Sequence, residues 1–568
     1  MKSTPSNCFS IRLLLAICLV LVWSGCDDET KKTDADTDTP SGLTDTSTDS
    51  SPDTTVTDTS SDLATDTPAD TTMDTAPDEV ADTTSTDVEL TILFTANEHA
   101  ATNPIDASGY VTGGAANMVS WWLQNEDFVP GRTIVLSGGD SLSSTSLATL
   151  TQGEASVAVM NAMSYSAVLF GNLDFNYGRA VLEQRISESS FGWVGSNILD
   201  AATGQVSSLG KAYEMLEVDG VSVAIIGLAE VDSPSTGFGQ AMQGLEFAEH
   251  VETLQTVVPQ ARGAGADVVI VVVHECVGSF VPDMTAVTVP AVDAYFALRC
   301  GALANPTDSL NGAPLLVAQS NWNDYARLGL RVSLSDGTVS PHDPGLVLVQ
   351  YASGNPNPVT PSAAVQAVVD TWNDSIAAII SEVIGYTAIG VANPSWELNN
   401  FIADSWLASF PDANFALTNN GGIRAGIAPG DITVGEIIDV APFDNLIFKL
   451  TLTGQQLTDS FAAARAGCTI GNVYCPAAIA GFTYTPSPVT LFKSDGSAVD
   501  PNTSYTVLVN NFMYFGGSGF DFQALDPTPI DTGVFYRQPA IERLRALGTT
   551  NLDPLENHLD AVPRNAGP

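Results

Sequence analysis

Basic residues are scarce in this chain of 568 residues: 20 Lys and Arg stand against 65 Asp and Glu, a formal net charge of −45. This excess of negative charge excludes a general nucleic-acid-binding surface, because phosphates need positive side chains to neutralise them. It also argues against attraction to anionic lipid headgroups through protein side chains. Charged residues make up only 15% and hydrophobic residues 44%, so most of the chain can bury cores. At roughly 150 residues per domain, the length predicts two or three domains.

Long apolar runs are also missing, apart from one short run near the amino terminus. Residues 13–22 follow Lys2 and Arg12 and are too few to span a membrane, so residues 1–26 are predicted to be an export signal. The segment VWSGC, which ends at Cys26, resembles a bacterial lipobox, in which the cysteine is lipidated and begins the mature protein. This interpretation predicts a lipid-anchored protein of the bacterial cell envelope, in the periplasm or at the cell surface. The alternative is an ordinary cleavable signal in which Cys26 is incidental.

Residues 27–88 consist almost entirely of Thr, Asp, Ser, Pro and Ala, and they carry 18 acidic residues against two lysines. No apolar period is present, so no core could offset the entropy of ordering this segment. We therefore expect a disordered tether, extended by its own charge. A calcium-binding or glycosylated stalk is the alternative, although the Asp spacing lacks the Gly and Glu of a calcium loop.

Cysteine is sparse, and no CxxC or Cys/His zinc pattern occurs. Once Cys8, Cys18 and Cys26 are assigned to the signal and the anchor, four cysteines remain in an exported setting that favours disulfides. Cys468 and Cys475 lie seven residues apart around a Gly-Asn pair, which suits a local disulfide. Cys276 and Cys300 would then pair by elimination, although sequence alone does not prove the connectivity.

From residue 89 onward, strand-like runs alternate with helical patterns, which predicts an α/β fold. Residues 88–95 and 133–136 are strand candidates, and the continuous β-branched runs at 221–228 and 268–273 predict buried strands. Helical spacing is found at 153–163 and 183–187, and again at 361–384, where a helix would link two α/β units. Polar side chains follow several strand ends, where α/β folds place their chemistry: Asn97, His99, Asp140, Asn172 and His274.

These strand-end motifs, in this order, resemble the 5′-nucleotidase family. The markers are TILFTANEH, GGAANM, SGGDSL, GNLDFNYG and VVVH in the first unit, and NNGGIR, GDITVGE, APFDN and NNFMYFGGSGF in the second. The resemblance implies a calcineurin-like, four-layer metallophosphoesterase domain of two sheets flanked by helices, followed by a linking helix and a C-terminal α/β nucleotidase domain. The expected bounds are 1–26 for the signal, 27–88 for the tether, 89–355 for the first domain, 356–385 for the linking helix and 386–560 for the C-terminal domain.

The resemblance also implies a site with two divalent metals, which clamp a phosphate and activate water. By motif, the possible ligands are His99, Asp140, Asn172 and His274, with Asn97 in place of a family aspartate. The family's catalytic histidine and its aspartate partner are replaced by Leu173 and Asn176. Two further histidine ligands are missing where the family motif falls on residues 297–301, and Arg299 there adds a positive charge.

Of the four remaining ligand candidates, only Asp140 carries a formal negative charge. Glu98, Asp174 and Glu275 are possible substitutes that would bring further carboxylates. A divalent metal (Mn, Zn or Ca) is therefore a possible cofactor, and hydrolysis by the family's mechanism is expected to be weakened or lost.

The second unit keeps more of the family's substrate-binding pattern. By motif, Phe443 and Phe512 would sandwich a nucleobase, while Asn419 and Arg424 would contact the base and the ribose or phosphate. Two departures stand beside these matches: Ser518 replaces a ribose-contacting aspartate, and Glu397 replaces an arginine. Ordinary core packing is the alternative interpretation of the two phenylalanines.

Three hypotheses follow from the sequence. The first is an exported, membrane-tethered member of this family that has weak or no hydrolysis and can bind a nucleoside or nucleotide. The second is an active phosphoesterase with a rearranged metal site. The third is a non-catalytic structural or interaction protein of the cell surface. Leu173, Asn176 and the missing histidines favour the first and the third over the second.

Overall fold

The computed structural model describes residues 87–565, except 104, 108–109, 286–287, 299–307, 319–320, 351–358 and 469–471. The predicted signal, Cys26 and nearly all of the predicted tether lie outside these residues, as do Arg299 and Cys300. By its internal contacts the chain divides between Ala81 and Asp82, and every described element belongs to the unit from Asp82 to Pro568. Within the described part, no helix has both the length and the apolar character needed to cross a membrane.

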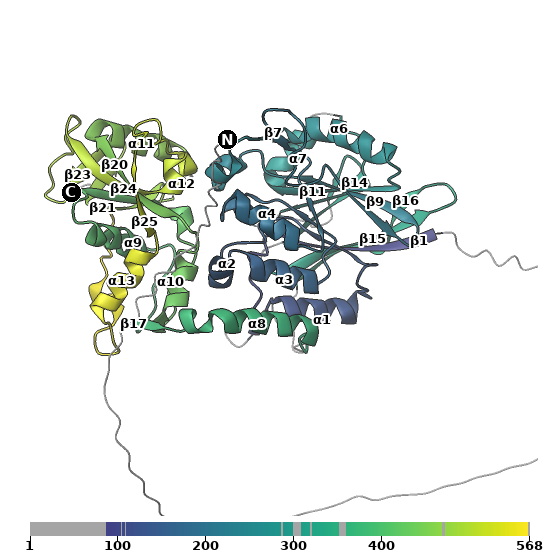
Figure 1. Ribbon diagram of the computed structural model, residues 1–568, viewed down its shortest axis with the longest axis horizontal. Helices are drawn as coiled ribbons and strands as arrows, with labels where there is room; N and C mark the ends of the chain where they lie inside the picture. Colours follow the sequence, from purple (N-terminus) through teal and green to yellow (C-terminus); the bar gives the residue numbers. More distant parts are fainter. Residues whose placement is uncertain are drawn as a thin grey trace, which may run out of the picture. The chain divides into compact units, whose positions relative to one another are not determined.

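Two six-stranded sheets form the first lobe, defined here as residues 87–350 (Figure 1). In spatial order the first sheet contains β16 (Val339–Gln350), β15 (Asp324–Ser333), β1 (Asp87–Thr95), β4 (Ile134–Ser137), β5 (Ala167–Leu169) and β6 (Gly192–Val194). The second contains β13 (Asp308–Leu310), β14 (Ala313–Ala318), β12 (Ala294–Leu298), β11 (Val268–Cys276), β9 (Val221–Leu228) and β8 (Glu214–Val218). Two small ribbons accompany them: β2 (Ile105–Ala107) with β3 (Tyr110–Thr112), and β7 (Ile198–Asp200) with β10 (Leu245–Phe247).

The central strands of both sheets carry apolar side chains on both faces. Their inner faces therefore pack against each other, and their outer faces pack against helices. In β1, Leu90, Ile92 and Phe94 join the core between the sheets, while Leu93 joins the core on the other face. In β11, the residues at 268, 270 and 272 enter the inter-sheet core, and those at 269, 271 and 273 enter the outer core. The continuous β-branched run thus forms a strand that is buried on both faces, as predicted.

Helices cover the outer faces of both sheets. Beside the first sheet lie α1 (Ala115–Asn125), α3 (Glu154–Ala162) and α4 (Arg179–Glu188), and beside the second lie α6 (His250–Gly263) and α7 (Val277–Thr285). Short helical segments are α2 (Ser146–Thr151), η1 (Asn172–Phe175), α5 (Ser233–Thr236) and η2 (Gly239–Met242). The order helix, sheet, sheet, helix confirms the expected four-layer architecture.

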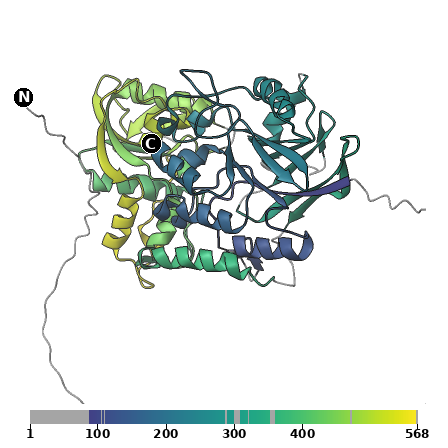
Figure 2. The same cartoon turned by 45° about the vertical axis from the view of Figure 1, so that its right-hand side comes forward.

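Helix α8 (Ala363–Ile380) follows the first lobe and contacts α1, α2 and α3, as well as α10 (Val434–Val440) of the second lobe (Figure 2). The sequence predicted helix as far as residue 384, which is wrong at the carboxyl end. The β-branched pair Val383 and Ile384 instead begins β17 (Val383–Thr387), which pairs with β19 (Gly430–Thr433).

The second lobe, defined as residues 383–565, is built on one five-stranded sheet. In spatial order its strands are β21 (Ala477–Ala480), β18 (Phe415–Asn419), β24 (Ser504–Asn510), β20 (Leu446–Thr453) and β25 (Ile530–Phe535). A hairpin of β22 (Phe482–Pro486) and β23 (Val489–Lys493) accompanies it. The helical segments are α9 (Trp396–Ser409), η3 (Asn420–Gly422), α10 (Val434–Val440), α11 (Gly454–Ala466), α12 (Asn511–Tyr514), η4 (Gly517–Gly519), α13 (Gln538–Leu547) and η5 (Leu555–His558).

Both faces of this sheet are buried. Ala416 of β18 packs into one core with α9, α10 and α13, while its neighbours Phe415 and Leu417 pack into the other core with α11. A disulfide joins Cys468 to Cys475 beyond the end of α11. Cys276 is also disulfide-bonded, but because Cys300 lies outside the described residues, that pairing stays a prediction.

The two lobes meet where α2 lies against α10. The backbone N–H of Ser146 donates to Asp439 Oδ1 at 2.6 Å, and the Thr149 hydroxyl donates to the Pro442 carbonyl at 2.5 Å. Helix α2 begins six residues after Asp140, at the end of the loop that follows β4. The contact therefore places that loop beside the second lobe.

Candidate functional site

Three strand ends of the first lobe bring polar side chains together. Strands β1, β4 and β5 are parallel neighbours, so their carboxyl ends, followed by His99, Asp140 and Asn172, lie along one edge of the first sheet. Strand β11 of the second sheet carries His274 to the same place. The sequence predicted each of these positions separately, and the fold makes them neighbours.

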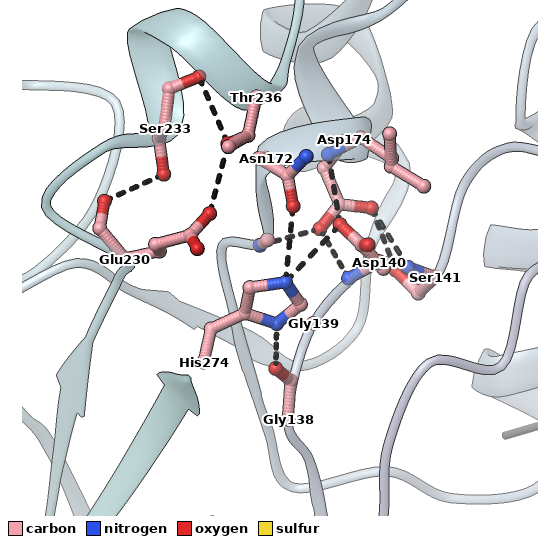
Figure 3. A network of polar contacts seen from close by, with 12 residues as sticks. Gly138, Gly139, Asp140, Ser141, Asn172, Asp174, Glu230, Ser233, Thr236 and His274 are labelled. Atoms are coloured by element: carbon pink, nitrogen blue, oxygen red, sulfur yellow. Dashed lines mark hydrogen bonds and ion pairs between the residues drawn. The ribbon is translucent and has the colours of Figure 1, made fainter. Parts of the chain in front are cut away.

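Asp140, Asn172 and His274 form a compact hydrogen-bonded cluster (Figure 3). His274 Nε2 lies 3.2 Å from Asn172 Oδ1 and 3.5 Å from Asp140 Oδ1, while its Nδ1 lies 2.6 Å from the Gly138 carbonyl. The backbone N–H of Leu173 also donates to Asp140 Oδ1 at 2.8 Å. Both imidazole nitrogens of His274 therefore face acceptors and act as donors.

The pKa values follow from this arrangement. Burial alone would lower the pKa of His274, but the charge and the hydrogen bond of Asp140 outweigh burial and raise it to about 9. Burial likewise opposes ionisation of Asp140, whose pKa is nevertheless held below its usual value by His274. The pair is an imidazolium and a carboxylate at neutral pH, and each neutralises the other.

Two glycines allow the strand-end loops to approach this closely. Gly139 has φ of +92°, and a Cβ there would lie 2.6 Å from the backbone nitrogen of Gly171. A Cβ on Gly171 would lie 2.2 Å from Asp140 Oδ1 and 2.7 Å from Cε1 of His274. The two glycines therefore permit the contact between Asp140 and His274.

Asp174, a candidate substitute metal ligand, instead accepts hydrogen bonds from backbone N–H groups. Its carboxylate is 1% exposed and accepts N–H hydrogen bonds of 2.8–3.0 Å from residues 140, 141, 142 and 171. It thereby ties the β4 loop to the β5 loop. With four backbone donors on its two oxygens, this carboxylate is committed to holding the loops.

The other two candidate substitutes are also engaged elsewhere. Glu98 is fully buried and accepts from the Thr95 hydroxyl at 2.6 Å and the Ser137 hydroxyl at 2.8 Å. Glu275 lies 3.3 Å from His250 Nδ1, and that histidine's other nitrogen lies 2.9 Å from the Ala229 carbonyl.

His99 and Asn97 lie on the β1 loop of the same edge. His99 Nδ1 lies 3.0 Å from Asn321 Oδ1, and burial lowers its pKa, so this imidazole is neutral. Asn97 Oδ1 is buried and makes no hydrogen bond within the described residues. Asn97 is an amide and brings no charge, so Asp140 is the carboxylate left to balance a cation.

The residues present do not fit the pair of divalent metals that the family resemblance implies. Within the part of the chain that the structure describes, no three His, Cys, Asp or Glu side chains are grouped so that they could hold a metal ion. A metal ligand must be a neutral imidazole or a carboxylate with an oxygen to offer. His274 donates from both nitrogens, and Asp140 is committed to His274 and to the Leu173 backbone.

A cavity of about 380 Å³ opens beside this cluster and is lined from both lobes. The first lobe contributes Asp140, Asn172, Leu173, Asn176, Ser235, Thr236 and Phe238. The second lobe contributes Asn419, Gly421, Arg424, Phe443, Asn445, Phe512 and Ser518. All four residues expected to bind substrate thus line one cavity, together with the two that replace the catalytic pair.

On the second-lobe side, aromatic and amide side chains are held in place by buried neighbours. Phe443 is half-buried, with the Arg424 guanidinium 5.9 Å from its ring centre. The Arg537 guanidinium donates to the Phe443 carbonyl, which fixes that loop. Asn419 Oδ1 accepts from Asn510 Nδ2 at 2.8 Å.

Phe512 packs against η4. A Cβ on Gly517 would lie 2.4 Å from the Phe512 ring, so the glycine leaves the space that the ring occupies. Phe443 and Phe512 are both only partly buried, each at the edge of a different core of the second lobe. Both also line the cavity, so they are not simply core residues.

The sequence interpretation missed Ser235, Thr236, Phe238 and Asn445. The first three belong to the loop that follows β9, where a strand of the second sheet ends. These residues could have been found as Asp140 was, because they also follow the end of a parallel strand. No sequence motif, however, indicated which of the residues after β9 would face the cavity.

A model of the 5′-nucleotidase C-terminal domain matches residues 383–526, which make up most of the second lobe. The second lobe therefore carries a 5′-nucleotidase C-terminal domain, and the chain as a whole is similar to the 5′-nucleotidase of Vibrio cholerae, at 22% identity over 494 residues, which is 78% of this chain and 88% of that protein. The crystal structure of the 5′-nucleotidase precursor from Thermus thermophilus shares the fold, with a TM-score of 0.68 and 21% identity, covering 84% of this chain and 99% of that one.

Two proteins that are similar in sequence to this chain are longer than it is. Endonuclease YhcR of Bacillus subtilis is 25% identical over 440 residues, which is 72% of this chain and 35% of that protein. Cell wall protein Lmo0130 of Listeria monocytogenes is 25% identical over 522 residues, which is 78% of this chain and 64% of that protein. This chain thus spans about a third of the first relative and less than two thirds of the second.

Proposed function

We propose that this chain is an exported member of the 5′-nucleotidase family that binds a nucleoside or nucleotide and has lost, or nearly lost, phosphoester hydrolysis. The observation that carries the proposal is the cavity, in which the side chains suited to a nucleoside face Leu173 and Asn176. Hydrolysis of nucleotide phosphate esters is the family's role. In this chain the residues suited to binding a nucleoside are kept, and the residues at the family's catalytic positions are replaced.

The binding half is supported by four side chains of the second lobe. Phe443 and Phe512 offer aromatic faces, and stacking of a base on such a face contributes about 1–3 kcal/mol. Asn419 can read a polar base edge, and Arg424 can contact a ribose or a phosphate.

Loss of hydrolysis is supported by Leu173 and by the ion pair behind it. Leu173 can neither donate nor accept a proton, and removing one positioned acid or base costs about 10²–10⁴ in rate. Asp140 and His274, which would be ligands in the family's two-metal chemistry, are paired with each other. Among the described residues that line the cavity, Asp140 is the one carboxylate, and it is already paired with His274.

Export is supported by the amino-terminal signal pattern and by one relative being named a cell wall protein. Lipidation at Cys26 is part of the proposal. Labelled palmitate should mark the wild-type chain in the producing cell and should not mark Cys26→Ser. Equal labelling of both would remove the anchor from the proposal.

Binding is tested by calorimetry on the purified full chain with adenosine and AMP. Phe512→Ala should weaken the binding of the better ligand by about 5- to 150-fold, which corresponds to the loss of one stacked face. Phe492→Ala is the matched control, because Phe492 is a half-buried phenylalanine of β23 that does not line the cavity. Absence of binding to the wild type would sink the proposal in favour of a structural role.

A further inference from the structure

The first-lobe end of the cavity has a chemistry that a phosphate does not fit. It is lined by Asp140, Asn172, Leu173 and Asn176 from the strand-end loops and by Ser235, Thr236 and Phe238 from the loop after β9. Among all the described lining residues, the ionisable side chains are Asp140 at this end and Arg424 on the second lobe. A phosphate placed at the first-lobe end would meet the Asp140–His274 pair, whose charges cancel, and none of the described lining residues at that end carries an unpaired positive charge to attract it.

Thr236 presents a hydroxyl whose proton is already committed. Its Oγ1 lies 2.8 Å from the Glu230 carboxylate and within 3.5 Å of two carbonyls of its own helix, all of which are acceptors (Figure 3). The proton is therefore donated within the loop, and the lone pairs remain to accept a hydrogen bond from the cavity. A ligand hydroxyl can supply that proton, and an ionised phosphate cannot.

The loop that carries Thr236 is seated tightly on the strand-end loop. A Cβ on Gly237 would lie 2.4 Å from the Asn172 carbonyl oxygen, so the two loops touch at that residue. Helix α5 also contacts η4 of the second lobe, which carries Ser518. Thr236 is thus held where the two lobes meet. It lines the cavity together with Leu173 and Asn176 of the first lobe and with Phe443 and Phe512 of the second.

Two apolar side chains lie among the polar ones at this end. Leu173 stands where the family motif has histidine, and the half-buried Phe238 lines the cavity from the β9 loop. These two side chains offer a charged oxygen no hydrogen-bond partner, whereas a methylene group packs well against them.

From these observations, and resting on the proposed function, we propose that the cavity selects an uncharged nucleoside over its 5′-phosphate. Thr236 accepts a hydrogen bond from the hydroxymethyl group of the sugar, and Leu173 and Phe238 pack around that group. The base lies toward Phe443 and Phe512. Thr236 and Phe238 are therefore the specificity-determining residues of this chain.

The test is calorimetry on the full chain with adenosine, 5′-deoxyadenosine and AMP, using wild type, Thr236→Val and Thr256→Val. Thr256 is the matched control, because it is an exposed helical threonine of α6 that donates to a carbonyl four residues earlier and lies outside the cavity. Wild type and Thr256→Val should bind adenosine at least about tenfold more tightly than AMP, and about 2- to 10-fold more tightly than 5′-deoxyadenosine. Thr236→Val should bind adenosine and 5′-deoxyadenosine equally.

The outcomes separate this inference from the function on which it rests. AMP binding as tightly as adenosine, or more tightly, would overturn the nucleoside preference and leave the proposed function standing. Equal binding of adenosine and 5′-deoxyadenosine by the wild type would overturn the role of Thr236. Binding of none of the three ligands would overturn the inference and the proposed function together.

Discussion

Gly171→Ala tests the close contact between the strand-end loops most sharply. The new methyl group would lie 2.2 Å from Asp140 Oδ1, 2.4 Å from the Asp140 backbone nitrogen and 2.7 Å from His274 Cε1. Real Cβ atoms do not approach their neighbours within 3.0 Å, so the loops must separate. Two of these atoms belong to buried charged side chains and the third to backbone, so none can move aside cheaply.

Overpacking of this kind costs about 1–3 kcal/mol, and the weakened pairing of Asp140 with His274 adds to it. For a lobe of this size, 1 kcal/mol corresponds to roughly 2–4 °C, so we expect the melting temperature to fall by about 4–10 °C. Differential scanning calorimetry of the full chain measures the shift. Near-ultraviolet circular dichroism at 20 °C checks that the variant is folded.

Gly263→Ala is the matched control for this substitution. Gly263 is the last residue of α6, nothing lies within 4 Å of its added Cβ, and alanine favours a helix over glycine by about 1 kcal/mol. The two Gly-to-Ala changes should therefore shift the melting temperature in opposite directions. A melting temperature of Gly171→Ala within 1 °C of the wild type would refute the tight packing of the two loops.

Three further predictions follow from the described contacts. Glu98→Gln should remove a pH dependence of the free energy of unfolding, because burial raises the Glu98 pKa to about 7. As pH rises from 4.5 to 7, the unfolded wild type loses a proton that the folded state keeps, so its free energy of unfolding should fall by about 3 kcal/mol relative to that of the variant. An equal change in the free energy of unfolding of both proteins over this pH range would contradict this. Cys475→Ser should lower the free energy of unfolding by about 2–3 kcal/mol, because it opens a loop closed across seven residues; an unchanged urea midpoint would count against it. Adding 1 mM Mn²⁺ should leave the melting temperature within 1 °C, because Asp140 and His274 are paired; a rise of several degrees would indicate a bound metal.

The buried strands and the α/β class were predicted from apolar patterns, whereas the four-layer arrangement was implied by the resemblance to the family. The continuous β-branched run at 268–273 predicted a buried strand. In the structure it belongs to β11, which is buried on both faces. Residues 88–95 were likewise predicted as a strand, and they form most of β1. The end of α8 was misjudged because Val383 and Ile384 suit a helix face and a strand equally, and pairing with β19 decided between them.

The site was readable only in part. Motifs identified residues such as Asp140, Phe443 and Phe512, which line one cavity. They did not reveal that Asp174 would bind four backbone N–H groups, because hydrogen bonds between loops depend on how the strand ends converge. Thr236 was missed for the same reason, since its orientation depends on Glu230 and on the contact of Gly237 with Asn172.

Phosphate release from AMP by the purified full chain, with excess Mn²⁺, Zn²⁺ or Ca²⁺, tests the central claim most directly. Asp140→Ala is measured beside the wild type, so that a contaminating phosphatase is recognised by equal rates in both. The account predicts a wild-type rate indistinguishable from the blank that contains metal and AMP alone. Turnover of about 1 s⁻¹ or faster that is lost in Asp140→Ala would contradict it.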